Sequence, residues 1–173
     1  MRVVAGECRG RRLVSPPGSA TRPTSDRVRE SIFNALGSLD AIEGADVVDL
    51  FAGSGALGIE ALSRGASTAV FVESDRTACS VITANLASCG LSDRGSVVTA
   101  DASVFESLRA ADVVLADPPY AFDGWEALAG RLDAAWLVAE SGKEIELGDG
   151  WQIIRSKSYG RTWVTIARRL HDD

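Results

Sequence analysis

Short apolar runs alternate with amphipathic stretches along most of the chain. The runs that begin near Val47, Ala69, Val97 and Asp112 are typical of strands buried on both faces. Between them, apolar residues recur at helical spacing. This alternation predicts an α/β fold with a mainly parallel sheet covered on both faces. Two last strands, joined by a turn at residues 159–161, add an antiparallel C-terminal edge hairpin.

Turn and capping residues set the bounds of the expected elements. Helices are expected at residues 26–36, 56–64, 75–90, 104–108 and 125–132. Strands are expected at residues 47–51, 69–72, 97–99, 112–116, 137–138, 152–155 and 163–167. Thr24 or Ser25 is placed to cap the first helix, and Gly37 to end it. Before that helix, residues 2–15 predict a short β-hairpin, which the following prolines turn into a loop.

Charge is distributed unevenly between the two ends of the chain. The net charge of the 173 residues is −6, yet residues 1–29 hold seven arginines against two acidic residues, a local charge of +5. Solvated arginines on an exposed arm are one interpretation; a phosphate-binding arm on an acidic body is the other. The phosphate-binding interpretation divides the chain into a basic extension at residues 1–38 (hairpin, loop and helix) and a main domain at residues 39–173. The candidate contacts to the phosphates of a nucleic acid are Arg9, Arg11, Arg12, Arg22, Arg27 and Arg29.

Composition argues against several classes of protein. No apolar run approaches the roughly 20 residues that cross a bilayer. The first residues are too polar for a signal peptide, and the three scattered cysteines indicate reduced thiols, so we expect a cytoplasmic protein. His171 is the single histidine, which argues against histidine triads and most zinc chemistry, and we expect no metal site.

A glycine-rich turn follows the first apolar strand. Gly53, Gly55 and Gly58 match the dinucleotide fingerprint G-x-G-x-x-G, and Glu73 ends the next strand, where it can accept hydrogen bonds from ribose hydroxyls. An NAD-binding oxidoreductase and a methyltransferase that uses S-adenosylmethionine (SAM) both predict these residues. Asp49 favours SAM, because a carboxylate suits its positively charged amino end. Asp101 can bind an adenine amine or cap a helix.

The fourth strand leads into Asp117-Pro118-Pro119-Tyr120. Paired prolines can simply end a strand. They can also fix the backbone so that the Asp117 carboxylate and the Pro118 carbonyl accept hydrogen bonds from one NH₂ group, while Tyr120 stacks on a planar base. Alignment of such an amine with a methyl donor is worth about 7–11 kcal/mol in favourable intramolecular cases. A base inside a helix must be flipped out to reach such a pocket.

The chain resembles the bacterial family of 16S ribosomal RNA (guanine-N2)-methyltransferases of the RsmD type. The resemblance covers nearly the whole chain, through blocks at residues 6–11, 22–34, 49–58 and 60–65 and the Asp-Pro-Pro-Tyr site. It implies a Rossmann-like class I SAM-dependent methyltransferase fold, with residues 39–173 as the SAM-binding methyltransferase domain. It also implies methylation of a guanine N2 amine, and 16S rRNA within the small ribosomal subunit or its precursor as partner. A monomer is expected. The catalytic residues would be Asp117, Pro118, Pro119 and Tyr120, and the cofactor-binding residues Asp49, Phe51, Gly53, Ser54, Gly55, Glu73, Ser74, Asp101 and Ala102.

Other functions stay open at this point. The oxidoreductase interpretation leaves the Asp-Pro-Pro-Tyr motif and the arginines unexplained. N6-adenine methylation of nucleic acid, or protein-amide methylation, would use a similar tetrapeptide, and a non-catalytic RNA-binding or ribosome-assembly module could keep the fold. The stretch between Leu132 and Glu146 looks shorter than is usual in the family, so only a brief fifth strand is expected near residues 137–138.

Overall fold

The computed structural model describes residues 1–18, 24–106 and 110–170. Its elements follow one another as α1 (Asp26–Ser38), β1 (Asp46–Leu50), α2 (Ala56–Ser63), β2 (Thr68–Glu73), α3 (Arg76–Cys89), β3 (Gly95–Thr99), β4 (Ala111–Ala116), α4 (Trp125–Arg131), β5 (Ala134–Ser141), β6 (Trp151–Tyr159) and β7 (Thr162–Arg169). Among the described helices, none is long and apolar enough to cross a membrane.

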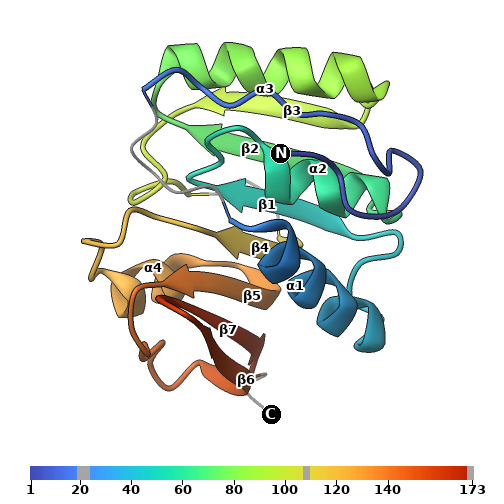
Figure 1. The fold of residues 1–173 in the computed structure, drawn as a ribbon. Helices are drawn as coiled ribbons and strands as arrows, with labels where there is room; N and C mark the ends of the chain where they lie inside the picture. Colours follow the sequence, from blue (N-terminus) through green and yellow to red (C-terminus); the bar gives the residue numbers. More distant parts are fainter. Residues whose placement is uncertain (19–23, 107–109, 171–173) are drawn as a thin grey trace.

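The strands form one seven-stranded sheet in the order β3-β2-β1-β4-β5-β7-β6 (Figure 1). The first five are parallel, whereas β7 runs antiparallel to both β5 and β6. The predicted α/β class, with a mainly parallel sheet and an antiparallel C-terminal edge, is confirmed. The strand order reverses between β1 and β4, and in open α/β sheets ligands bind beyond the carboxyl ends of the strands at such a point.

Alternate residues of the central strands enter two different cores. Val47, Phe71 and Leu115 pack with buried residues of α1, α2 and α3 on one face. Val48 and Val114 pack with buried residues of α4 on the other. Figure 1 shows α1 and α2 in front of the strands. Because both faces are covered, the strands read as continuous apolar runs in the sequence.

The N-terminal segment lies over this helical layer and shares its core. Val3, Cys8 and Leu13 are buried in the same cluster as α1 and α2, so no separate core marks a boundary at residue 38. Gly6 approaches α2 so closely that a Cβ there would lie 1.8 Å from the Ser63 carbonyl oxygen. The hairpin expected at residues 2–15 is present in a short form, with one antiparallel bridge between Arg2 and Arg12. Its arms are joined by hydrogen bonds from the Val3 N–H to the Arg11 carbonyl oxygen at 2.9 Å and from the Leu13 N–H to the Met1 carbonyl oxygen at 3.0 Å.

Other expected elements differ in extent. Ser25 caps α1 by accepting a hydrogen bond from the Val28 N–H, and the helix continues through Gly37 to Ser38. Residues 104–106 form no helix, and the rest of the helix expected there, residues 107–108, lies outside the described residues. The fifth strand is eight residues long rather than two, because it pairs with β4 on one side and β7 on the other.

Candidate active site

The parallel register brings the polar residues of several strands to one edge of the sheet. Leu50 pairs with Val72 on one side and Ala116 on the other, and Ala116 pairs in turn with Ala139. The residues that come next along these strands are Phe51, Glu73, Asp117 and Glu140. Four neighbouring strands therefore deliver an aromatic ring and three carboxyl groups to one edge of the sheet.

The glycine-rich turn at the end of β1 is fixed by Glu73. Phe51, Gly53 and Gly55 all have positive φ, which reverses the chain sharply before α2. The Gly53 N–H donates to Glu73 Oε2 at 2.9 Å, and the Asp75 N–H donates to Glu73 Oε1 at 2.9 Å. Glu73 thus joins the turn after β1 to the turn after β2. Ser54 is half-buried beside this turn, and Ser74 is exposed.

Asp49 has a structural role in addition to its candidate role in cofactor binding. It is 1% exposed, and its Oδ2 accepts a hydrogen bond from the Gly58 N–H at 2.9 Å. Burial is the main cause that raises the pKa of Asp49 well above its ordinary value. A Cβ at Gly58 would lie 2.3 Å from the Phe71 ring, so this glycine lets α2 pack closely on the sheet. The predicted contact between Asp49 and the amino end of SAM stays a prediction.

Asp101 follows β3 and is exposed, while the adjacent Ala102 is buried. Asp101 Oδ1 accepts hydrogen bonds from the Ser103 N–H at 2.9 Å and from the Ser103 hydroxyl at 2.7 Å. These bonds hold the pKa of Asp101 below its usual value. The carboxylate shapes a local turn rather than the cap of a helix, and its exposed side remains available to a ligand.

The Asp-Pro-Pro-Tyr tetrapeptide leaves β4 as a stiff turn. Pro118 is buried, and the Pro119 carbonyl accepts a hydrogen bond from the Phe122 N–H at 2.8 Å. Tyr120 is 53% exposed, and its hydroxyl lies 2.9 Å from the Thr162 hydroxyl. Phe122 stacks at an angle on Phe51, with 5.5 Å between ring centroids, so the turn after β4 contacts the turn after β1.

Thr24 and Glu140 belong to this site, although the sequence offered Thr24 only as a candidate helix cap and did not single out Glu140. The Thr24 hydroxyl oxygen lies 3.1 Å from Asp117 Oδ2 and 2.9 Å from Glu140 Oε1. Glu140 is 3% exposed. Its carboxyl group at a strand end is the same signal that identified Glu73, but it was hidden because the fifth strand looked too short.

Burial dominates the electrostatics of this pair. It raises the pKa of Asp117 to about 6, while the hydrogen bond from Thr24 lowers it. Burial, helped by the charge of Asp117, raises the pKa of Glu140 to about 8. Near neutral pH, Asp117 is therefore ionised and Glu140 carries a proton. A protonated Glu140 can donate to the Thr24 oxygen while the Thr24 hydroxyl donates to Asp117, so that both contacts of the Thr24 oxygen are hydrogen bonds.

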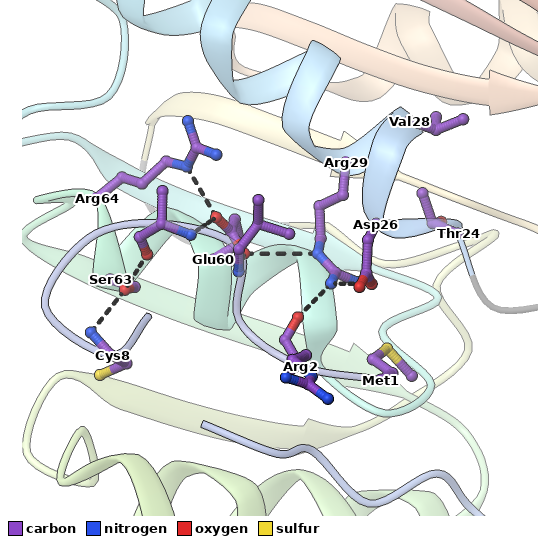
Figure 2. A network of polar contacts seen from close by, with 12 residues as sticks. Met1, Arg2, Cys8, Thr24, Asp26, Val28, Arg29, Glu60, Ser63 and Arg64 are labelled. Carbon is purple, nitrogen blue, oxygen red and sulfur yellow. Dashed lines mark hydrogen bonds and ion pairs between the residues drawn. The ribbon is translucent and has the colours of Figure 1, made fainter. Parts of the chain in front are cut away.

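The predicted RNA-binding arginines divide into two groups. Arg9, Arg11, Arg12 and Arg27 are exposed, and Arg22 lies outside the described residues. Arg29 is a correction: its side chain is 0% exposed, so no surface is left for an RNA phosphate. It donates to the Arg2 carbonyl oxygen and to Asp26, and its Nε lies 3.5 Å from Glu60 Oε2 (Figure 2).

Glu60 is the centre of this buried network. The carboxylate accepts hydrogen bonds from the N–H groups of Val4 and Ala5, at 2.8 and 3.0 Å, and pairs with Arg64 at 2.8 Å (Figure 2). The network ties the N-terminal segment to α1 and α2. Thr24 lies directly before Ser25, the residue that caps α1. Arg29 thus holds the segment that supplies a hydroxyl to the catalytic candidates.

The comparisons with known proteins agree over almost the full length. The sequence model of the family described as Conserved hypothetical protein 95 matches residues 1–168. The chain is 38% identical to YlbH of Bacillus subtilis, which is named as an rRNA methyltransferase, over 98% of this chain and 99% of that protein. It is 36% identical to ribosomal RNA small subunit methyltransferase D of Escherichia coli K12, over 99% of this chain and 89% of that one.

The solved structures give the same picture. The structure of the methyltransferase yhhF from Escherichia coli aligns with a TM-score of 0.85 and 34% sequence identity, over 98% of this chain and 97% of that one. The strand order, the Asp-Pro-Pro-Tyr turn and the near-complete alignments lead to one assignment. The chain belongs to the family described as Conserved hypothetical protein 95, the family of ribosomal RNA small subunit methyltransferase D.

Proposed function

We propose that this protein is a SAM-dependent methyltransferase that methylates the exocyclic N2 amine of a guanine in 16S rRNA. The observation that carries the proposal is the position of Asp117-Pro118-Pro119-Tyr120 at the end of β4, next to the glycine-rich turn at the end of β1. Relatives named as rRNA methyltransferases support the reaction class and an RNA substrate. The small subunit as substrate follows from the name of one of them.

The edge of the sheet offers groups that suit SAM. Glu73 ends β2 and can accept from ribose hydroxyls, Asp101 is exposed after β3, and the turn at residues 51–55 leads into the N-terminus of α2. A Cβ at Gly53 would meet only the Phe51 carbonyl oxygen, at 4.0 Å, so the turn is open on its outer side. When bound, SAM supplies a methyl group on a positively charged sulfur. Phe51, Ser54, Ser74 and Ala102 lie beside these groups and complete the proposed cofactor site.

The residues of the tetrapeptide would bind and orient the base. The ionised Asp117 carboxylate accepts one N–H of the amine, and the prolines prevent this acceptor from drifting. Tyr120 is held by Thr162, with more than half of its surface exposed to stack on the base. Alignment in a pocket that excludes water is expected to supply most of the rate enhancement.

Thr24 and Glu140 would keep Asp117 ready to accept a proton. The amine loses one proton when it gains a methyl group, and Asp117 is placed to accept it. A protonated Glu140 keeps the Thr24 hydroxyl directed at Asp117, so that a single negative charge is present on the pair before the reaction.

A protein that methylates rRNA would work in the cytoplasm, and we expect it to be a monomer. The test is transfer of a labelled methyl group from SAM to unmodified small ribosomal subunits, naked rRNA and duplex DNA, followed by identification of the nucleosides. We expect N2-methylguanosine from an rRNA substrate. Label in N6-methyladenine would keep the chemistry but replace the base. SAM binding without any transfer would favour an assembly module.

A further inference from the structure

A groove of about 430 Å³ lies between α1 and the edge strand β6, away from the glycine-rich turn. The side chains that matter for the argument come from both elements: Arg27, Ser31 and Asn34 from α1, and Arg155, Lys157 and Tyr159 from β6. A hydrogen bond between the Ser31 hydroxyl and the Tyr159 hydroxyl joins the two elements.

The groove is basic although the protein as a whole is acidic. Arg27, Arg155 and Lys157 face one acidic residue, Glu30, whereas the whole chain carries a net charge of −6. Among the residues that the structure describes, no carboxylate lies within ion-pair distance of these three cations. All three are exposed. Cations without acidic partners, gathered on one surface, are typical of a phosphate-binding site.

The sheet register determines on which face of the sheet the two β6 cations, Arg155 and Lys157, lie. Arg155 pairs with Ile166 and Lys157 pairs with Val164, and both partners are buried in the core below α1. Paired residues of an antiparallel ladder lie on the same face. Arg155 and Lys157 are therefore on the α1 face of the sheet. The ammonium of Lys157 lies 5.2 Å from the centre of the Tyr159 ring.

The groove connects with the proposed catalytic turn. Tyr159, which lines it, pairs with Thr162, and the Thr162 hydroxyl lies 2.9 Å from the hydroxyl of Tyr120. A strand of nucleic acid whose base contacts Tyr120 would thus meet this groove with its adjacent backbone.

We propose that the groove binds the RNA sugar-phosphate backbone that flanks the target guanine, with Arg27, Arg155 and Lys157 as phosphate contacts. This inference rests on the proposed function and adds a second basic surface to the N-terminal arginines. A nucleic-acid backbone fits better than an acidic protein segment, because Thr162 links Tyr159 at the groove to Tyr120, the residue that would stack on the base.

The test is a double variant, Arg155→Gln/Lys157→Gln, with Arg131→Gln on α4, on the opposite face of the sheet, as a matched control. Binding of naked, unmodified 16S rRNA is measured over a series of salt concentrations. Each lost phosphate contact is expected to reduce the salt slope by about 0.7–0.9 log unit. We expect weaker binding, a flatter slope and a higher KM with little change in kcat, whereas Arg131→Gln keeps the wild-type values.

The outcomes separate this inference from the proposed function. If the wild type methylates rRNA but the double variant keeps its affinity and slope, the groove does not bind RNA. If the double variant loses affinity only for assembled subunits and not for naked rRNA, the groove contacts a ribosomal protein and the inference is overturned. If the wild type transfers no methyl group, the proposed function fails, while the binding measurement still decides the role of the groove.

Discussion

Asp117 and Glu140 share the hydroxyl group of Thr24, although they come from different strands; Glu140 is buried and Asp117 is half-buried. Their positions follow from the register of β4 and β5, in which Ala116 pairs with Ala139 just before the two carboxyl groups. Two neighbouring carboxyl groups with little access to solvent do not ionise at the same pH. The pair therefore loses its protons in two steps, near pH 6 and near pH 8.

The two steps predict a bell-shaped pH dependence of methyl transfer. Activity rises through about pH 6 as Asp117 ionises and can accept an N–H, and falls above about pH 8 as Glu140 ionises and draws the Thr24 hydroxyl away. Glu140→Gln keeps a donor for Thr24 without a titrating group, so we expect the lower limb to remain and the upper limb to disappear. A pH profile of kcat/KM checks this, with the exposed Glu126→Gln as control. An unchanged upper limb would assign that limb to another group.

The same groups predict that the protein becomes less stable as pH rises. Burial raises the pKa of Asp117 and Asp49 above 3.8 and that of Glu140 above 4.5. The folded state therefore holds protons that the unfolded chain releases. Their contribution to the free energy of unfolding is greatest below the pKa values of the unfolded chain. It is lost as pH rises through about 6 and then about 8. Urea titrations at about pH 5, 7 and 9 measure this fall. Glu140→Gln should remove its upper part.

Loss of the Asp117 carboxylate is predicted to abolish methyl transfer and to leave SAM affinity within a few fold, because the side chain is proposed to contact the base. Single-turnover transfer and equilibrium SAM binding measure the two effects. Asp123→Ala removes an exposed carboxylate from the following loop and serves as control. Wild-type turnover in Asp117→Ala would remove this residue from the mechanism.

Arg29 is predicted to stabilise the fold rather than to bind RNA. Arg29→Ala leaves Glu60 buried with one cation fewer, and breaking a buried pair in this way costs about 3–5 kcal/mol. The free energy of unfolding in urea checks the cost. Arg64→Ala should cost less, since this partner of Glu60 is partly exposed and Arg29 remains. An Arg29 variant as stable as the wild type would show that the network contributes little.

The exposed N-terminal arginines are predicted to bind RNA phosphates. Replacing Arg9, Arg11 and Arg12 by glutamine should weaken rRNA binding and flatten its salt dependence by up to about 0.9 log unit for each lost contact. Binding titrations over a range of salt concentrations measure the slope. Arg131→Gln, an exposed cation on α4, provides the comparison. A slope equal to that of the wild type would make the arm purely structural.

Local sequence patterns were sufficient for the central fold and for much of the candidate site. Strands such as Thr68–Glu73 carry their own signal, since burial on both faces requires consecutive apolar residues. The turn at residues 51–55 and the Asp-Pro-Pro-Tyr motif are contiguous in sequence and were recognised for that reason. The fifth strand was underestimated, because Ala134 and Glu140 belong to it only through pairing with β4 and β7.

The errors concern residues whose role depends on distant partners. Counting charges identifies a basic segment but does not reveal that Arg29 points inward, where Glu60 from a different helix meets it. Thr24 looked like a helix cap, and its hydroxyl instead contacts carboxyl groups 93 and 116 residues further along the chain. No periodicity within a short window contains such information.

The position of the N-terminal segment also determines when the protein can complete its fold during synthesis. Val14 is held by Asn85 in α3, 71 residues later, and Thr24 by Glu140 at the end of β5, 116 residues later. Contacts at such separations form late, because the intervening chain must be ordered first. Thr24 therefore reaches its final contacts only after β5 has been added to the sheet. The two carboxyl groups acquire their shared hydroxyl only at that late step.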